Sequence, residues 1–394
     1  MTASLKPLLP GATLGVMGGG QLGRMFVHAA QAMGYSTAVL DADPASPAGL
    51  VSHHHLQAGY TDVAALVELA RLSDAVTTEF ENVPAPALRT LAASVPVAPA
   101  AEAVAICQDR AAEKAHFGRA GVPCAPYAVI DTEATLVAVD EALLPGILKT
   151  ATLGYDGKGQ ARVADRAALA AAWERMGRVR CVLEQLLPLQ RELSVIVARG
   201  ADGHAVCFPV QQNLHRDGIL AVTQVPAPDV DPALAEEAAR CAKAIAGSMG
   251  YVGVLCVEFF VVVDAAGESR LVANEMAPRP HNSGHYTIDA CDVSQFDQQV
   301  RCMAGLPLVE PRLHSAAVML NLLGDLWFPA GATEPRTPDW AGVLALPGAH
   351  LHLYGKAEAR PGRKMGHLTF TGATPEDARA LAQRACVLLG LPGF

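Results

Sequence analysis

The feature that most constrains the fold is an apolar run that contains a single carboxylate. Residues 252–263 read VGVLCVEFFVVV, residues 264–267 read DAAG, and residues 270–276 read RLVANEM. Two apolar runs joined by a turn rich in Asp and Gly are typical of an antiparallel hairpin. An unpaired carboxylate buried in such a run costs several kcal/mol, so Glu258 needs a cation or strong hydrogen bonds. The hairpin must therefore carry a polar site.

The returning strand of this hairpin supplies two more oxygen ligands. Asn274 and Glu275 stand at nearly the mirror position of Glu258 about the turn, which places two carboxylates and an amide side by side. Hard oxygen ligands of this kind suit magnesium bound to nucleotide phosphates. A buried pair of arginine and glutamate is the alternative. We expect Glu258 and Glu275 to hold magnesium.

Composition narrows the classes of function. The chain has 394 residues, 51% of them hydrophobic and 18% charged, which predicts two or three globular domains. A net charge of −9 argues against a broad nucleic-acid surface and favours small-molecule chemistry. Because the apolar stretches are short or interrupted, we expect neither secretion nor a membrane span. Nine cysteines without a Cys-x-x-Cys pair indicate reduced thiols in a cytoplasmic protein, without disulfides or zinc.

Hydrophobic periodicity predicts an α/β first domain over residues 1–100. Short apolar runs alternate with helical spacing, as in a parallel sheet, and the domain ends near the Pro-rich stretch 95–99. The expected strands are 12–17, 36–41 and 75–80, and the expected helices run from Leu22 to Met33, closed by Gly34, and over 63–72 after Asp62.

Residues 101–310 predict a central domain and residues 311–394 a small α+β domain. The central domain is expected to begin with a helix over 102–119 and to continue into an antiparallel lid at about 124–200. Asp231 and Pro232 are expected to begin a helix that extends to about 249, and another helical stretch is expected near 293–304. The expected lid strands are 146–150, 160–163, 181–186, 192–199 and 204–211. The last domain is expected to contain strands 315–322, 349–354 and 366–371 and a helix begun by Thr374 and Pro375.

Two glycine-rich segments indicate phosphate binding. Gly18-x-Gly20-x-x-Gly23 lies between a strand and a helix, with Asp41 near the end of the next strand. Glycines at such a turn allow an anion to approach the helix N-terminus, so the binding of a phosphate group of some kind is favoured over the binding of NAD. Tight packing without a ligand is the alternative. Residues 153–160 (LGYDGKGQ) contain three glycines around Lys158 and follow Lys149. Such a loop can close over phosphates, whereas a plain hairpin turn needs only one glycine.

Polar residues are dense after the hairpin. Residues 278–285 (PRPHNSGH) contain Arg279, His281, Asn282, Ser283 and His285, which suits an anionic or polar substrate.

Three further groups carry weaker signals. Arg360, Arg363 and Lys364 form a basic turn that suits a phosphate, with a solvated turn as the alternative. Glu79 and Glu81 end a strand where open α/β sheets bind ligands. The histidines at 53–55 are interpreted as a solvated loop rather than a metal site.

Taken together, the motifs resemble the ATP-grasp superfamily and, within it, the 5-(carboxyamino)imidazole ribonucleotide synthase family. The resemblance runs from about residue 12 to about 390, and only a ten-residue N-terminal extension and the histidine run depart from it. The motifs that carry it are GGGQLGRM at 18–25, QDR at 108–110, GYDGKGQ at 154–160, NLHRDGI at 213–219, NEMAPRPHNSGH at 274–285 and RPGRKMGH at 360–367.

The resemblance implies an ATP-grasp fold with a Rossmann-like N-terminal domain, a central domain with a lid, and a C-terminal domain. It implies ATP and magnesium as cofactors, with catalytic roles for Lys149, Arg279, His281 and Asn282. The residues implied at ATP are Arg110, Lys149, Gly154, Tyr155, Asp156, Gly157, Lys158, Gly159, Gln160, Glu184, Gln185, Leu186, Leu187, Glu192, His215, Asn274 and Glu275. Those implied at aminoimidazole ribonucleotide are Gln21, Leu22, Glu79, Tyr155, Asp156, Arg279, His281, Lys356, Arg363 and Lys364.

The implied reaction is the ATP- and bicarbonate-dependent carboxylation of aminoimidazole ribonucleotide in purine biosynthesis, by a cytoplasmic homodimer that binds neither nucleic acid nor membrane. The first-domain glycines then serve this substrate rather than NAD. An NAD-dependent oxidoreductase and a non-catalytic nucleotide sensor are the competing hypotheses.

Overall fold

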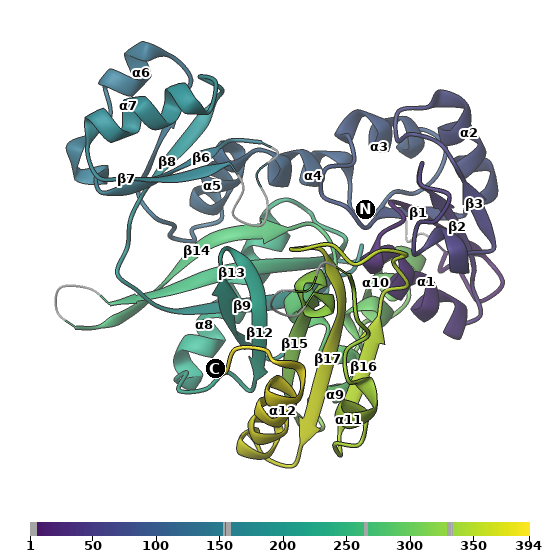
Figure 1. The fold of residues 1–394 in the computed structure, drawn as a ribbon. Coiled ribbons are helices and arrows are strands. Elements are labelled where there is room, and N and C mark those ends of the chain that lie inside the picture. Colours follow the sequence, from purple (N-terminus) through teal and green to yellow (C-terminus); the bar gives the residue numbers. More distant parts are fainter. Residues whose placement is uncertain (1–5, 153, 155–158, 264–266, 329–331, 333) are drawn as a thin grey trace.

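The structure is a computed structural model that describes residues 6–152, 154, 159–263, 267–328, 332 and 334–394. Its strands form three sheets, of four, nine and four strands. In Figure 1 the two smaller sheets lie above the large sheet, on opposite sides of the molecule. The mixed α/β class expected from the sequence is confirmed. No helix in the described ranges combines the length and apolar character that a bilayer span requires.

The N-terminal sheet is parallel, with the order β3-β2-β1-β4, as the alternation of strands and helices predicts. Gly34, at φ +84°, follows Met33, the C-cap of helix α1. The histidine run is not a loop, because His54 and His55 belong to a short edge strand. The elements are β1 (Thr13–Met17), α1 (Gln21–Ala32), β2 (Ser36–Leu40), η1 (Gly49–Val51), β3 (His54–Leu56), α2 (Val63–Leu72), β4 (Ala75–Thr78) and α3 (Ala85–Ala92).

Two helices replace the single helix expected over 102–119. Helix α4 (Ala101–Gln108) ends where Asp109 turns to an extended conformation, and α5 (Arg110–Arg119) begins at the next residue. The Asp109 side chain accepts a hydrogen bond from the backbone N–H of Ala112, so it caps α5. This break places Arg110 at the first turn of a helix.

The lid is a four-stranded antiparallel sheet with the order β5-β8-β6-β7. It has its own apolar core, which includes Ile130, Leu148, Trp173 and Leu183. Its elements are β5 (Tyr127–Ile130), α6 (Glu133–Val137), η2 (Glu141–Leu143), β6 (Gly146–Thr150), β7 (Gln160–Val163), α7 (Arg166–Arg175) and β8 (Cys181–Gln185).

The sequence-based placement of 192–199 and 204–211 in the lid is wrong. Strand β9 (Leu189–Arg199) pairs with β13 (Gly253–Val263) along the middle of the large sheet. Residues 204–211 do not form one strand, because the chain leaves the ladder around Pro209, between β10 (Ala205–Cys207) and β11 (Gln211–Arg216). Proline lacks the N–H that an inner strand needs.

The large sheet has the order β14-β13-β9-β11-β12-β15-β17-β16, with β10 paired to β9. The C-terminal strands continue this sheet, because β12 pairs with β15. Asp231 caps α8 and Thr374 caps α12, both as expected. The remaining elements are β12 (Ile219–Val225), α8 (Pro232–Ser248), β13 (Gly253–Val263), β14 (Ser269–Ala277), η3 (Asn282–Gly284), α9 (Thr287–Ala290), α10 (Gln295–Ala304), β15 (Ala316–Leu323), η4 (Gly324–Trp327), α11 (Trp340–Leu344), β16 (Ala349–Leu353), β17 (Lys364–Gly372) and α12 (Pro375–Leu389).

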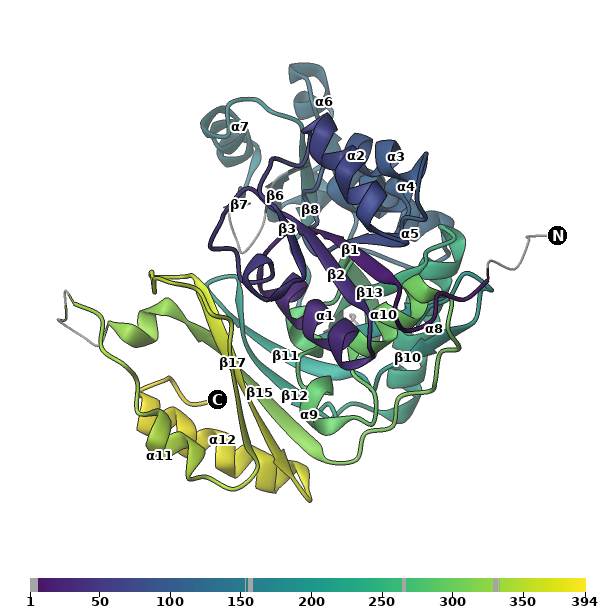
Figure 2. The same cartoon turned by 90° about the vertical axis from the view of Figure 1, so that its right-hand side faces the viewer.

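Helix α10 joins the N-terminal sheet to the large sheet. Phe296 and Val300 pack in one apolar core with Val27 of α1. Gln299 accepts a hydrogen bond at 2.6 Å from the backbone N–H of Val254 and donates at 2.9 Å to the Thr77 hydroxyl. Figure 2 shows α1 beside α10. The carboxyl edge of β4 is thereby held close to β13.

A substitution in the lid core tests whether the lid is a separately stabilised unit. Trp173 is almost fully buried, and its indole N–H donates to the Val179 carbonyl at 2.9 Å. Trp173→Ala should destabilise the lid by about 3–5 kcal/mol while the large sheet stays folded. Hydrogen exchange should then accelerate in 127–185 alone, with the exposed substitution Val387→Ala as a control of little effect. Equal acceleration in β13 would contradict a separate lid.

Candidate active site

The centre of the site is the pair of carboxylates predicted from the hairpin. Glu258 on β13 and Glu275 on β14 are direct partners across the ladder. The register shifts between Glu258 and Phe259, so Asn274 is the extra residue of a β-bulge. The Asn274 side-chain oxygen is buried and has no hydrogen-bond partner among the described residues. Three hard oxygen ligands are thus available on neighbouring positions.

The two carboxylates differ in their surroundings. Burial and the nearby charge of Glu275 raise the pKa of Glu258 to about 8. Burial acts in the same direction on Glu275, but Arg110 and Lys149 outweigh it and hold the Glu275 pKa below its usual range. Arg110 donates to Glu275 Oε2 at 3.2 and 3.3 Å. The arginine–glutamate alternative is therefore realised at Glu275, while Glu258 retains a raised pKa.

A chain of buried ion pairs links the lid to this hairpin. Lys149 of β6 donates to Glu184 of β8 at 3.0 Å, and Lys114 of α5 lies 3.3 Å from the other Glu184 oxygen. Lys114 also lies 3.3 Å from the Asn274 carbonyl, and its side chain is 0% exposed. Burial lowers the pKa of Lys149, against the opposing charge of Glu184. Lys114 and Lys149 thus place positive charge beside the hairpin that carries Glu275.

Sequence reasoning missed Lys114 and Glu113. Glu113 accepts a hydrogen bond at 2.6 Å from the Met276 backbone N–H, and burial raises its pKa to about 7. The signal was available, because Arg110, Glu113 and Lys114 stand at i, i+3 and i+4 and so share one face of α5. That face is turned toward β14.

The other residues assigned to ATP occupy the lid and the large sheet. Glu192 of β9 forms an ion pair with His215 of β11, and the neighbouring carboxylates raise the His215 pKa although burial acts to lower it. Gln185 donates to the Ala142 carbonyl at 2.9 Å, and Leu186 follows it on an exposed connection. Leu187 continues this connection toward β9. Gly154, Gly159 and Gln160 are the described residues of the predicted phosphate loop. The assignments at Tyr155, Asp156, Gly157 and Lys158 lie outside the described residues.

The loop after β14 brings several polar side chains to the carboxylates. Arg279 forms an ion pair with Glu81, and His281 Nε2 lies 3.5 Å from Glu258 Oε1. Asn282 is 7% exposed, yet in the part of the chain that the structure describes neither its side-chain nitrogen nor its oxygen has a hydrogen-bond partner. Leaving a buried amide unsatisfied is costly, so Asn282 is suited to meet a ligand.

The glycine turn holds an anion of the protein itself. Glu79 accepts hydrogen bonds from the backbone N–H groups of Gly20 at 2.9 Å and Gly23 at 3.1 Å. Asp41 accepts from Gly19 at 2.7 Å. In this structure these side-chain carboxylates occupy the glycine N–H groups that were expected to be open to a phosphate. Gln21 and Leu22 begin α1 immediately beside the Glu79 carboxylate.

The basic turn and Lys356 lie within electrostatic range of the carboxylates of the site. Lys356 donates to the Lys364 carbonyl at 2.6 Å, and burial together with Arg363 lowers the Lys356 pKa to about 8. The positive charge of Lys364 acts to lower the pKa of both Glu81 and Glu258, so Lys364 lies within electrostatic range of both carboxylates. Arg363 donates to the Glu358 carbonyl at 2.8 Å.

This arrangement defines the class of the protein. A lid and a large antiparallel sheet with cations between them characterise an ATP-grasp protein, and residues 115–296 match the ATP-grasp domain family. Residues 11–108 match the ribonucleotide synthetase preATP-grasp domain, and residues 317–381 match the phosphoribosylaminoimidazole carboxylase C-terminal domain.

The relatives define the family more narrowly. The chain is 45% identical to an N5-carboxyaminoimidazole ribonucleotide synthase of Brucella melitensis over 365 residues, which are 92% of this chain and 97% of the relative. An N5-carboxyaminoimidazole ribonucleotide synthetase in complex with ADP superposes with a TM-score of 0.88 at 39% identity, over 99% of each chain. The Aspergillus clavatus enzyme, in complex with ADP and 5-aminoimidazole ribonucleotide, gives 0.85 at 32% identity, over 96% of this chain and 99% of that one. The chain belongs to the N5-carboxyaminoimidazole ribonucleotide synthase family.

The raised pKa of Glu258 predicts how pH affects stability in the absence of divalent cations. Between pH 4.5 and about 8 the folded protein retains a proton that the unfolded chain has lost, so stability should fall as pH rises. The expected slope is at most about 1.4 kcal/mol per pH unit. Urea denaturation with a chelator should show that the free energy of unfolding falls less between pH 6 and pH 8 in Glu258→Gln than in the wild type. The control Glu236→Gln, at an exposed position, should show the same fall as the wild type. An unchanged fall in Glu258→Gln would refute the assignment.

Proposed function

We propose that this chain catalyses the ATP- and bicarbonate-dependent carboxylation of 5-aminoimidazole ribonucleotide to its N5-carboxy derivative, in purine biosynthesis. The observation that carries the proposal is the meeting of a facing carboxylate pair with buried cations from the lid and from α5. The ADP and ribonucleotide in the related structures support it. The cytoplasmic location and the homodimer are part of the same proposal, through the family alone.

The proposed reaction has two stages. A bicarbonate oxygen attacks the γ-phosphorus of ATP, so the bond from phosphorus to the ADP oxygen breaks and carboxyphosphate forms. Carboxyphosphate then breaks its carbon–oxygen bond and releases phosphate and carbon dioxide. The 5-amino nitrogen of the ribonucleotide attacks that carbon, and the proton it loses passes to the phosphate or to water. The protein has to position the reactants, neutralise their charge and exclude water.

The residues fit the magnesium that such phosphoryl transfer requires. Glu258, Glu275 and the unpartnered oxygen of Asn274 form a hard-oxygen donor set. Two facing carboxylates also need more positive charge than Arg110 alone supplies. When bound, the metal ion would neutralise charge on the nucleotide phosphates.

The chain's own residues supply the remaining charge and orientation. Lys149 and Arg110 would meet the transferring phosphoryl group from the lid side, and Arg279 from the opposite side. The free amide of Asn282 offers one donor and one acceptor, which matches the oxygens and hydroxyl of bicarbonate. The loop 154–160 is assigned to cover the phosphates, and Tyr155 and Asp156 to contact both substrates.

The ribonucleotide is assigned to the space between the glycine turn and the basic turn. Glu79, Gln21 and Leu22 would face the aminoimidazole and ribose, together with Arg279 and His281. Lys356, Arg363 and Lys364 would hold its phosphate.

The direct test of this function is ADP release measured with each substrate omitted in turn. We expect release to require Mg-ATP, bicarbonate and aminoimidazole ribonucleotide together, and NAD to have no effect. Glu275→Gln should abolish turnover by weakening the hold on magnesium while the protein stays folded by circular dichroism. Substrate-independent ADP release in the wild type would exclude the reaction, and near-normal turnover in the variant would exclude the metal assignment.

The basic turn generates a prediction about the second substrate. A charge-assisted hydrogen bond to phosphate contributes about 1.5–3 kcal/mol, so Arg363→Ala or Lys364→Ala should raise the KM for the ribonucleotide about ten- to a hundredfold. The KM for ATP should stay within about twofold, because the lid meets the nucleotide.

Arg360→Ala in the same turn is a matched control. Arg360 is 68% exposed and pairs with Glu358, so its loss should change neither KM. An equal effect on ATP would assign the turn to the nucleotide, and no effect in any variant would make it a solvated turn.

A further inference from the structure

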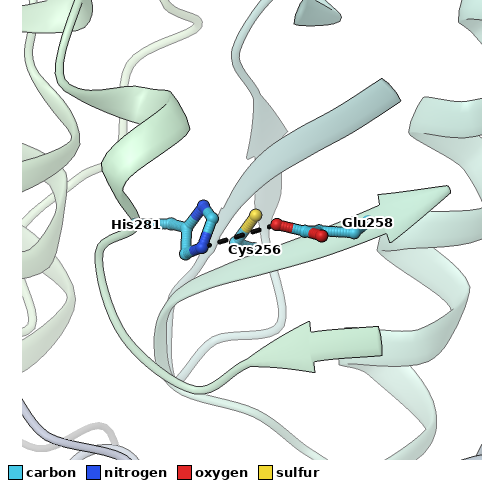
Figure 3. A group of neighbouring side chains, drawn as sticks. All are labelled: Cys256, Glu258 and His281. Carbon is cyan, nitrogen blue, oxygen red and sulfur yellow. Dashed lines mark ion pairs between the residues drawn. The ribbon is translucent and has the colours of Figure 1, made fainter. Parts of the chain in front are cut away.

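The thiol of Cys256 lies beside Glu258, a proposed magnesium ligand, although magnesium does not bind thiols. It lies on β13 two residues before Glu258, so the two side chains share one face of the strand. Figure 3 shows that Cys256 and Glu258 of β13 point toward His281, which belongs to the loop after β14. The ligand atoms of these three residues all lie within 4.8 Å of one another. The proposed function accounts for the carboxylate and the imidazole but leaves the thiol without a role.

The spacing of these atoms suits a single tetrahedral ion. His281 Nε2 and Glu258 Oε1 are 3.5 Å apart, which is long for a hydrogen bond. Two ligands about 2.0–2.2 Å from one tetrahedral zinc ion are separated by about 3.4 Å. The pair is therefore already at the separation that zinc requires, and the Cys256 sulfur lies within 4.8 Å of both ligand atoms.

The outer side of His281 is held as in metal sites. Its Nδ1 lies 2.9 Å from the Ser283 hydroxyl, so that nitrogen is occupied and Nε2 is left facing Glu258. Gln295 fixes the backbone of His281 by accepting from its N–H at 2.9 Å and donating to its carbonyl at 2.8 Å. Partners of this kind orient a metal-binding imidazole. Glu258 and His281 are 13% and 17% exposed, so an ion can reach them although Cys256 is fully buried.

We propose that Cys256, Glu258 and His281 form a binding site for zinc and similar thiophilic divalent cations. The Cys256 thiol releases its proton as the metal–sulfur bond forms, and a fourth coordination position stays open. Thiolate and imidazole ligands select zinc over magnesium. Because the ion takes Glu258 from magnesium and His281 from the substrate, its binding inhibits turnover. That inhibition rests on the proposed function, whereas zinc binding does not.

Cobalt(II) absorption tests the binding without any substrate. Reduced, metal-free wild-type protein with one equivalent of Co²⁺ should show a near-ultraviolet thiolate-to-cobalt band, which Zn²⁺ should bleach. Cys256→Ser and Cys256→Ala should lack the band. Cys386→Ser, which removes a buried thiol from the C-terminal core, should keep it. A wild type without the band, or the same band in both Cys256 variants, would overturn the site.

Inhibition is measured separately, as ADP release at fixed Mg²⁺ with increasing Zn²⁺. The half-inhibiting Zn²⁺ concentration should rise at least about tenfold in Cys256→Ser and Cys256→Ala, with activity without zinc retained, and should not change in Cys386→Ser. Equal sensitivity of all variants would overturn the inhibitory role. A protein that shows the cobalt band but no substrate-dependent ADP release would fail the proposed function and leave the metal site standing.

Discussion

Two carboxylates that face each other on neighbouring strands determine the charge balance of the whole site. Glu258 and Glu275 are ladder partners in a mostly apolar sheet, so their mutual repulsion must be compensated locally. Arg110 compensates Glu275 from α5, and the buried chain of Lys114, Glu184 and Lys149 carries positive charge from α5 to the lid. The lid and α5 are therefore tied to the hairpin by electrostatics. A bound metal cation would supply the positive charge that Glu258 lacks in the protein alone, and the cations of the site would then meet the nucleotide phosphates.

Hydrogen bonds from α10 fix the position of β4 and of the loop after β14 relative to this hairpin. Gln299 joins Val254 of β13 to Thr77 of β4, and Gln295 fixes the backbone of His281. The strand end that carries Glu79 and Glu81 is thereby kept near the loop that carries Arg279, and the Arg279–Glu81 ion pair closes the gap. Both glutamines are almost fully buried, where unsatisfied amides would be costly, so the alignment is specific.

The parts of the fold that depend on local sequence could be predicted, and the parts that depend on distant pairing could not. The Glu258–Glu275 partnership follows from a short turn, which fixes the register of a hairpin. Strand β9 contains a short apolar run, as the lid strand β8 does, and only its long-range pairing with β13 assigns it to the large sheet. The break at Asp109 depends on one capping side chain inside an otherwise helical pattern. At the glycine turn, the motif predicts an anion correctly, but the residue that supplies it, Glu79, is 56 positions from Gly23.

In the proposed function, this charge balance serves phosphoryl transfer from ATP to bicarbonate. The most direct measurement uses bicarbonate labelled with ¹⁸O and follows the label into inorganic phosphate by mass spectrometry. If the bicarbonate oxygen attacks the γ-phosphorus, each phosphate released should carry one ¹⁸O atom, because carboxyphosphate breaks at its carbon–oxygen bond. Phosphate without label, formed at the same rate as ADP, would mean that water is the attacking group and would contradict the account.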